Sequence, residues 1–158
     1  AAFACNGGSD AGGDNAGTSR HQYPASVRQI RTMCSGRVDQ AIIWHAFRMG
    51  APMVLVSGCH FTDCHYIDAV TWTQRRVEKV WSKMEKLGIR PERLQLEWIS
   101  AAEGQKFARV MQELDVMLRQ VTPKEVEETM QILAAEDLGA GTPRPLKKSR
   151  EQVFPIQN

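Results

Sequence analysis

Four cysteines are the residues of this chain whose type and spacing are best suited to chemistry: Cys5, Cys34, Cys59 and Cys64. Thiolates bind zinc and iron–sulfur clusters, act as nucleophiles, and pair as disulfides. Disulfides are typical of secreted proteins, but the first residues lack the charged flank and long apolar stretch of a signal peptide. We therefore expect a cytoplasmic protein in which the cysteines bind a metal or react, rather than form two disulfides.

The first cysteine opens a glycine-rich stretch, "CNGGSDAGG", which runs from Cys5 to Gly13. The stretch does not match the G-x-G-x-x-G pattern of dinucleotide-binding folds, and no "GK[ST]" of a P-loop follows it. A ribose-binding acid is also missing from the end of the next expected strand, where Cys34 stands instead. We interpret the glycines as positions where the backbone approaches the sulfur atoms closely and donates N–H groups to them.

Short apolar segments separated by helical patterns predict the elements that position these thiols. We expect strands over 1–6, 26–33, 52–58 and 93–100 and helices over 39–49, 66–87 and 101–121. The glycines within 12–20 predict only a broken helix or a turn. Trp44 falls off the predicted apolar face of its helix, so we expect it to contact another protein.

Alternating strands and helices predict a small, open, mostly parallel, doubly wound α/β sheet of the flavodoxin-like kind. Four strands are too few for a (β/α) barrel. A further helix is expected after Pro123, followed by a stretch rich in Gly, Pro and Lys without periodicity. We therefore divide the chain into an α/β domain over 1–122, an extra helix over 123–138 and an extended arm over 139–158.

This topology predicts that the four cysteines converge. Cys5, Cys34 and Cys59 each end an expected strand, and Cys64 precedes the long helix. The carboxyl ends of parallel strands share one edge of the sheet, where such folds build their sites. We therefore expect four thiols in one crevice.

The chemistry of four thiols leaves several uses open. An iron–sulfur cluster and a structural zinc ion both take four cysteine ligands. Structural zinc sites usually combine two close pairs, and this chain has only the close pair Cys59 and Cys64, which favours iron–sulfur. A thiol-based redox enzyme, with Cys34 activated by Arg37, is a further alternative.

Composition excludes other classes of function. The formal net charge of the 158 residues is only +2, and no basic stripe with interleaved aromatic residues is present, so nucleic-acid binding is not expected. The longest apolar run, "APMVLVSG", is much shorter than a membrane span. We expect no membrane insertion.

Three motifs, "MCSGRVD", "VSGCHFTDCHY" and "RLQLEWISAAEGQKFA", resemble the delta-subunit family of methyl-viologen-reducing hydrogenase, whose members are associated with heterodisulfide reductases. The resemblance covers about Phe3 to Val121. It implies a non-catalytic [2Fe-2S] electron carrier whose ligands are Cys5, Cys34, Cys59 and Cys64.

The same resemblance implies partners. One is a heterodisulfide-reductase-like subunit that contains flavin and iron–sulfur clusters. The other is an electron-donor or electron-acceptor subunit, such as a hydrogenase or formate dehydrogenase. The implied role is to relay electrons between them.

The chain departs from the family at its first motif. The family usually has "CNWCSYAGADLAG" where this chain has "CNGGSDAGGDNAG", so Gly8 replaces a cysteine and Gly7 a tryptophan. If the missing thiol is a ligand, the cluster is altered or absent. If it is a fifth, non-ligating thiol, the four remaining cysteines complete the site, and the requirement for four ligands favours this second interpretation.

Overall fold

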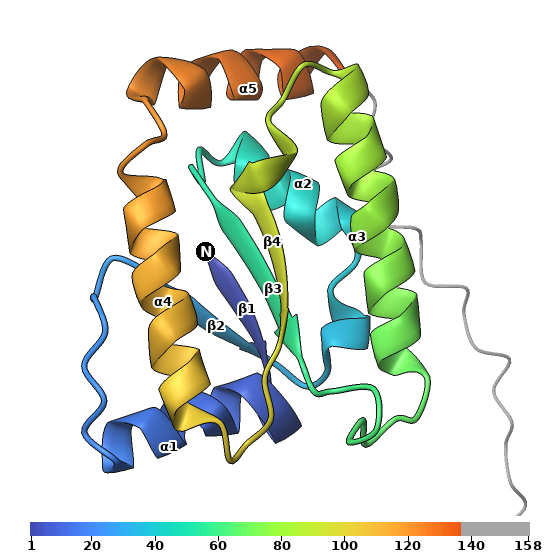
Figure 1. Cartoon of the computed structure of the whole chain (residues 1–158). Helices are drawn as coiled ribbons and strands as arrows, with labels where there is room; N and C mark the ends of the chain where they lie inside the picture. Colours follow the sequence, from blue (N-terminus) through green and yellow to red (C-terminus); the bar gives the residue numbers. More distant parts are fainter. Residues whose placement is uncertain (137–158) are drawn as a thin grey trace, which may run out of the picture.

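The computed structural model describes residues 1–136, and its strands form one parallel sheet (Figure 1). Over this range the strands are β1 (Ala2–Cys5), β2 (Gln29–Thr32), β3 (Val54–Gly58) and β4 (Leu94–Trp98). They are arranged in the order β2-β1-β3-β4, and every neighbouring pair is parallel. This is the strand order of flavodoxin-like folds, so the predicted fold class is confirmed.

Helices cover both faces of the sheet, as Figure 1 shows. One face carries α1 (Ala11–Thr18) and α4 (Gly104–Leu118), and the other carries α2 (Gln40–Arg48) and α3 (Ala69–Lys86). The last described helix, α5 (Pro123–Ala135), packs against α2. A π-helical turn, η1 (Asn6–Asp10), leads into α1, and two 3₁₀ turns precede α2 and β4: η2 (Ser35–Arg37) and η3 (Pro91–Arg93).

The central strands separate two hydrophobic cores. In β3, Val54 and Val56 point to the core beneath α2 and α3, while Leu55 points to the core beneath α1 and α4. In β1, Phe3 belongs to the core beneath α2 and α3, and Ala2 belongs to the core beneath α1 and α4. All five residues of β3 are buried, as the continuous apolar run predicted.

Helix α1 is more regular than its glycine content predicts. A Cβ at Gly12 would lie 2.9 Å from the Ser100 carbonyl oxygen, and one at Gly13 would lie 3.1 Å from the Phe107 ring. The glycines therefore let the helix approach α4 and the loop before it. The tertiary contact outweighs the low helix propensity of glycine.

The expected exposure of Trp44 is wrong. Its side chain is 1% exposed and belongs to the core that also contains Ile43, Phe47 and Leu133. Leu133 lies on α5, which packs over α2. The side of α2 that periodicity predicts to face outward is therefore covered by α5, a helix distant in sequence.

The helix after Cys64 also begins later than predicted, at Ala69 instead of Tyr66. Ile67 has a positive φ of 58°, and the Asp68 N–H donates to the Tyr66 carbonyl oxygen at 2.7 Å. This hydrogen bond closes a γ-turn around Ile67 that no helix can contain.

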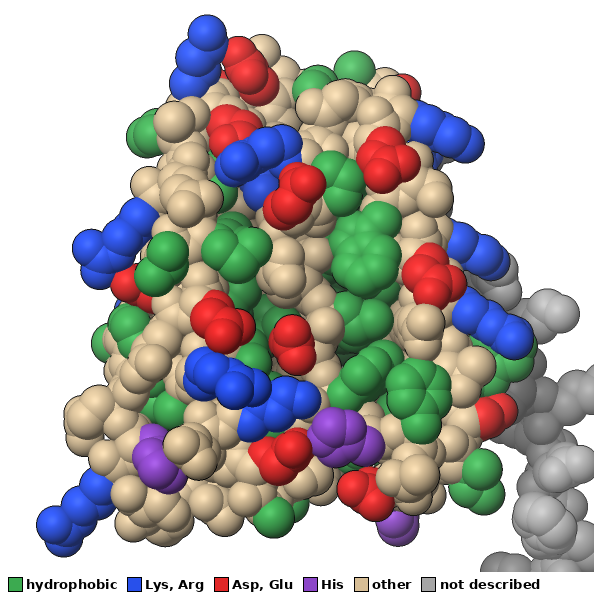
Figure 2. All heavy atoms as spheres, viewed as in Figure 1, with side chains coloured by type: hydrophobic (Ala, Val, Ile, Leu, Met, Phe, Trp, Pro, Cys, Tyr) green, Lys and Arg blue, Asp and Glu red, His purple; other side chains and the backbone are tan. Residues whose placement is uncertain are grey.

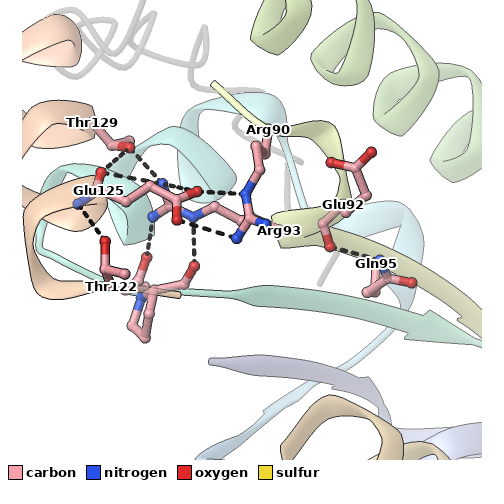
Figure 3. Close-up of polar contacts among 9 residues, drawn as sticks. Arg90, Glu92, Arg93, Gln95, Thr122, Glu125 and Thr129 are labelled. Atoms are coloured by element: carbon pink, nitrogen blue, oxygen red, sulfur yellow. Dashed lines mark hydrogen bonds and ion pairs between the residues drawn. The ribbon is translucent and has the colours of Figure 1, made fainter. Parts of the chain in front are cut away.

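A buried arginine attaches α5 to the sheet (Figure 3). Arg93 is 1% exposed, and it donates to the Pro52 carbonyl oxygen at 2.7 Å and to the Thr129 hydroxyl. Burial lowers the pKa of Arg93. Nearer the surface, Arg90 makes a bidentate contact with Glu125 at 2.7 and 3.1 Å. These contacts hold α5 at the amino-terminal end of the strands.

Strand β4 forms an edge of the sheet between α3 and α4, and Figure 2 shows hydrophobic side chains along this face with charged side chains around them. The Trp81 indole donates to the Leu94 carbonyl oxygen at 2.8 Å, and the Lys106 ammonium donates to the Trp98 carbonyl oxygen. These side chains occupy carbonyl groups that a further strand would need, which protects the edge from pairing.

Among residues 1–136, no helix combines the length and the apolar character needed to cross a bilayer. The arm expected over 139–158 lies outside the described residues.

Candidate four-cysteine site

The structure brings all four cysteines to one cavity at the carboxyl edge of the sheet. The cavity has a volume of about 340 Å³. It is lined by the four cysteines together with Asn6, Gly7, Met33, His65 and Tyr66. The convergence that parallel topology predicted is therefore present.

Cys5 and Cys59 form the buried side of the cavity. Cys5 is the last residue of β1 and Cys59 follows the neighbouring strand β3, and the two residues are 3% and 5% exposed. The two sulfur atoms are 3.7 Å apart. Thiolates that share one tetrahedral metal ion with bonds of about 2.3 Å lie about 3.8 Å apart, so this pair already has the spacing that a shared metal ion requires.

Cys34 and Cys64 form the more open side, and both are partly exposed. The Gly36 N–H, in turn η2, donates to the Cys34 sulfur at 3.4 Å. Cys64 lies in the loop between β3 and α3. In the part of the chain that the structure describes, no three His, Cys, Asp or Glu side chains are already arranged around a point that one metal ion could occupy.

The electrostatics of the cavity disfavour thiolates in the absence of a cation. Burial raises the pKa of Cys59, and the charges of the three other thiols raise it further. Burial also raises the pKa of Cys34, although the Gly36 N–H acts in the opposite direction. A bound metal ion reverses this balance because it stabilises deprotonated sulfur. A metal-free Cys34 nucleophile is disfavoured, since such a thiol needs a lowered pKa.

Two buried serines form hydrogen bonds next to the cavity, with the backbone of β1 and with each other. The Cys5 N–H donates to the Ser9 hydroxyl at 2.9 Å. The Ser57 hydroxyl lies 2.8 Å from that of Ser9 and 3.2 Å from the Phe3 carbonyl oxygen. Neither serine was predicted from the sequence, although a single serine in the otherwise apolar strand β3 was an available signal.

Gly8 lies directly against the site. A Cβ at Gly8 would be 2.8 Å from the Cys59 sulfur and 3.0 Å from the Ile99 carbonyl oxygen. Gly7 differs, since within the described residues no atom outside its chain neighbours and its own helical turn lies within 4 Å of a Cβ added there. A side chain at position 8 would therefore point at Cys59, whereas position 7 has free space.

A hydrogen bond between two side chains holds the loop after Cys59 to the start of α4. His60 Nε2 lies 2.6 Å from the Glu103 carboxylate, which also accepts the Ser100 N–H at 2.8 Å. The Ser100 N–H, and next the His60 ring, hold the pKa of Glu103 below its usual range. The pair fixes the position of residue 60 relative to the sheet.

Comparisons with known proteins identify a matching family and several relatives of this chain. The family model described as methyl-viologen-reducing hydrogenase, delta subunit, matches residues 1–122. The chain is 43% identical over 126 residues to the vhc iron-sulfur subunit of the F420-non-reducing hydrogenase of Methanococcus voltae, and the match covers 80% of this chain and 88% of that protein. It is 44% identical over 125 residues to the F420-non-reducing hydrogenase iron-sulfur subunit of Archaeoglobus profundus, covering 79% and 91%.

A further relative is much longer. The chain is 40% identical over 122 residues to one subunit of the ferredoxin/F420H2-dependent CoB-CoM heterodisulfide reductase of Methanosarcina acetivorans. The match covers 77% of this chain but only 15% of that protein. A unit similar to this chain is therefore one part of a larger polypeptide there.

Proposed function

Because the chain belongs to the delta-subunit family of methyl-viologen-reducing hydrogenase, we propose that it is a non-catalytic [2Fe-2S] electron-transfer subunit of a cytoplasmic multisubunit oxidoreductase. The observation that carries the proposal is the convergence of four free thiols on one cavity. When bound, the cluster would accept and release one electron at a time. Its ligands would be Cys5, Cys34, Cys59 and Cys64.

The residues of the chain have distinct roles in this proposal. Cys5 and Cys59 are buried and keep water from one side of the site. Cys34 and Cys64 are partly exposed, so this side lies closest to a partner. The Gly36 N–H donates to the Cys34 sulfur, and hydrogen bonds of this kind tune the reduction potential of a thiolate-bound metal.

The proposed partners are a flavin-containing, heterodisulfide-reductase-like subunit, and with it an electron-donor or electron-acceptor oxidoreductase. The names of the relatives support both, because they include subunits of hydrogenases and of a heterodisulfide reductase. In the Methanosarcina acetivorans relative, the similar unit and the remainder of that reductase subunit share one polypeptide. This arrangement supports the proposal that the separate chain binds a subunit of that kind.

Metal analysis and spectroscopy of anaerobically purified chain test the proposal. We expect about two iron and two sulfide per chain, visible absorption, and an EPR signal after one-electron reduction. A colourless protein with one zinc per chain would instead indicate a zinc-stabilised docking subunit, since four thiolates also suit zinc.

Replacement of Cys59 by serine tests the ligand assignment. We expect Cys59→Ser to lose most of the iron and the visible absorption, because Cys59 pairs with Cys5 at the spacing of a shared metal ion. His65→Ala is the matched control, since His65 lines the same cavity without supplying a thiol. Full iron content in Cys59→Ser, or equal loss in both variants, contradicts the assignment.

A further inference from the structure

We propose that an apolar rim beside the four-cysteine cavity, formed by Met33, Tyr66 and Ile67, is the surface through which this chain binds its heterodisulfide-reductase-like partner. The inference rests on the proposed function and locates the interface for it. The three side chains of the rim are 68%, 52% and 84% exposed, respectively. Two of them, Met33 and Tyr66, line the cavity that contains the thiols.

Ile67 carries two unfavourable features at one position. Its φ of 58° is a genuine outlier for a β-branched residue, and the γ-turn around it belongs to the rare, strained class. Its apolar side chain is also the most exposed of the large hydrophobic residues that the structure describes. Backbone strain of this kind clusters at binding sites and ligand clamps.

The loop that holds Ile67 is stabilised mainly by short-range hydrogen bonds. The Asp63 N–H donates to the His60 carbonyl oxygen at 3.0 Å, and the Ile67 N–H donates to the Cys64 carbonyl oxygen at 3.0 Å. Figure 1 shows this loop projecting beyond the carboxyl ends of the strands, below α3. The loop therefore presents Cys64 and Ile67 together to whatever binds at this edge.

One observation places the interface at the rim, and a second identifies the partner as the heterodisulfide-reductase-like chain. Electrons must leave through the partly exposed side of the cavity, where Cys34 and Cys64 lie, and the rim borders that side. The chain is also 40% identical to a unit that makes up 15% of a heterodisulfide reductase polypeptide, where the two are permanently joined. A separate chain needs a non-covalent surface in place of that link, and exposed apolar residues provide one.

The test is to measure the affinity of the reconstituted full chain for the heterodisulfide-reductase-like protein of the same organism, without oxygen. We expect Ile67→Asn to weaken binding at least about tenfold, because the variant buries no apolar side chain in the complex. Asparagine tolerates a positive φ, so the unfolding temperature of the variant should equal or exceed that of the wild type. Iron content should not change.

Met49→Asn is the matched control. Met49 is 72% exposed, but it follows α2 and precedes β3, so it lies at the opposite end of the sheet from the cavity. This variant should bind within about twofold of the wild type. The inference is overturned if Ile67→Asn binds like the wild type, if Met49→Asn is weakened equally, or if the wild type does not bind.

The metal analysis separates this inference from the proposed function. Rim-dependent binding by a chain without iron would support the interface and overturn the electron-transfer role. A complete cluster together with binding that is indifferent to Ile67 would overturn the interface alone.

Discussion

At the scale of single residues, the site depends on close contacts as much as on its thiols. Gly8 allows the turn after β1 to pass against the Cys59 sulfur, and Ser9 accepts the N–H of Cys5. Both residues act by positioning the cysteines. Any side chain at position 8, including the cysteine that the family resemblance implies there, would therefore alter the geometry of Cys59.

Alanine at position 8 should disturb the site. In Gly8→Ala the new methyl group would lie 2.8 Å from the Cys59 sulfur, and overpacking of this kind costs about 1–3 kcal/mol. We expect a lower urea midpoint and reduced iron retention. Gly7→Ala provides the control, because the described residues leave space around position 7. Equal behaviour of the two variants would contradict the role given to Gly8.

At the scale of secondary structure, the sequence predicted most elements and the convergence of the cysteines. The apolar run that forms β3 and the cysteines at the ends of β1 and β3 were sufficient for this, because parallel topology fixes where strand ends meet. The burial of Trp44 was not predictable from local periodicity, since α5, which covers it, comes from a distant part of the sequence. The γ-turn at Ile67 was also missed, because the residue type argues against a positive φ.

The attachment of α5 can be tested with two arginines that contact the same helix. Arg93→Ala should lower the free energy of unfolding by about 2–4 kcal/mol, because it leaves buried acceptors without donors and opens a cavity. Arg90→Ala should lower it by less than about 1 kcal/mol, since the Arg90 side chain in its ion pair with Glu125 is about half exposed. Urea denaturation measures both. Similar losses of unfolding free energy in the two variants would contradict the prediction that the buried arginine contributes more than the exposed one.

The contact between α4 and the loop before β2 predicts a dependence on pH. The Ser26 hydroxyl at 2.6 Å, and next Arg119, hold the pKa of Asp115 below its ordinary value of 3.8. A carboxyl group with a lowered folded pKa contributes stability above its unfolded pKa, and the contribution disappears as the pH falls through the folded value. Wild type should therefore lose more stability than Asp115→Asn below about pH 4.

Urea midpoints at several pH values between about 3 and 7 test this prediction. Ser26→Ala should reduce the difference between the wild type and Asp115→Asn, because the Ser26 hydroxyl is the largest cause of the shift. Parallel pH profiles of the wild type and Asp115→Asn would contradict it.

At the scale of the whole molecule, the two ends of the sheet differ in structure: one is closed by packing and the other holds the cavity. The amino-terminal end is closed by α5 and the buried Arg93, whereas the carboxyl end holds the cavity and the loop after Cys59. The two hydrophobic cores lie between these ends and include no residue of the 60–68 loop. The loop at the carboxyl end can therefore change its conformation without loss of the hydrophobic cores.

Removal of the proposed cluster should accordingly loosen only the carboxyl end of the sheet. After chelation, we expect helical circular dichroism to persist and amide hydrogen exchange to accelerate over 60–68, where the backbone hydrogen bonds are local. Exchange over 104–118, within α4, is the internal control and should stay slow. Global loss of protection in the metal-free chain would show instead that the fold depends on the metal.

The pairing of β1 with β3 also constrains the biosynthesis of the protein. Cys5 and Cys59 are separated by 54 positions, so a nascent chain leaving the ribosome carries the first thiol long before its neighbour. Zinc fingers take up metal as they fold, because their ligands come from a short stretch of chain. Here the crossover through β2 and α2 must be complete before the buried pair exists. We therefore expect the cellular machinery that delivers iron and sulfide to act on a chain that has already folded.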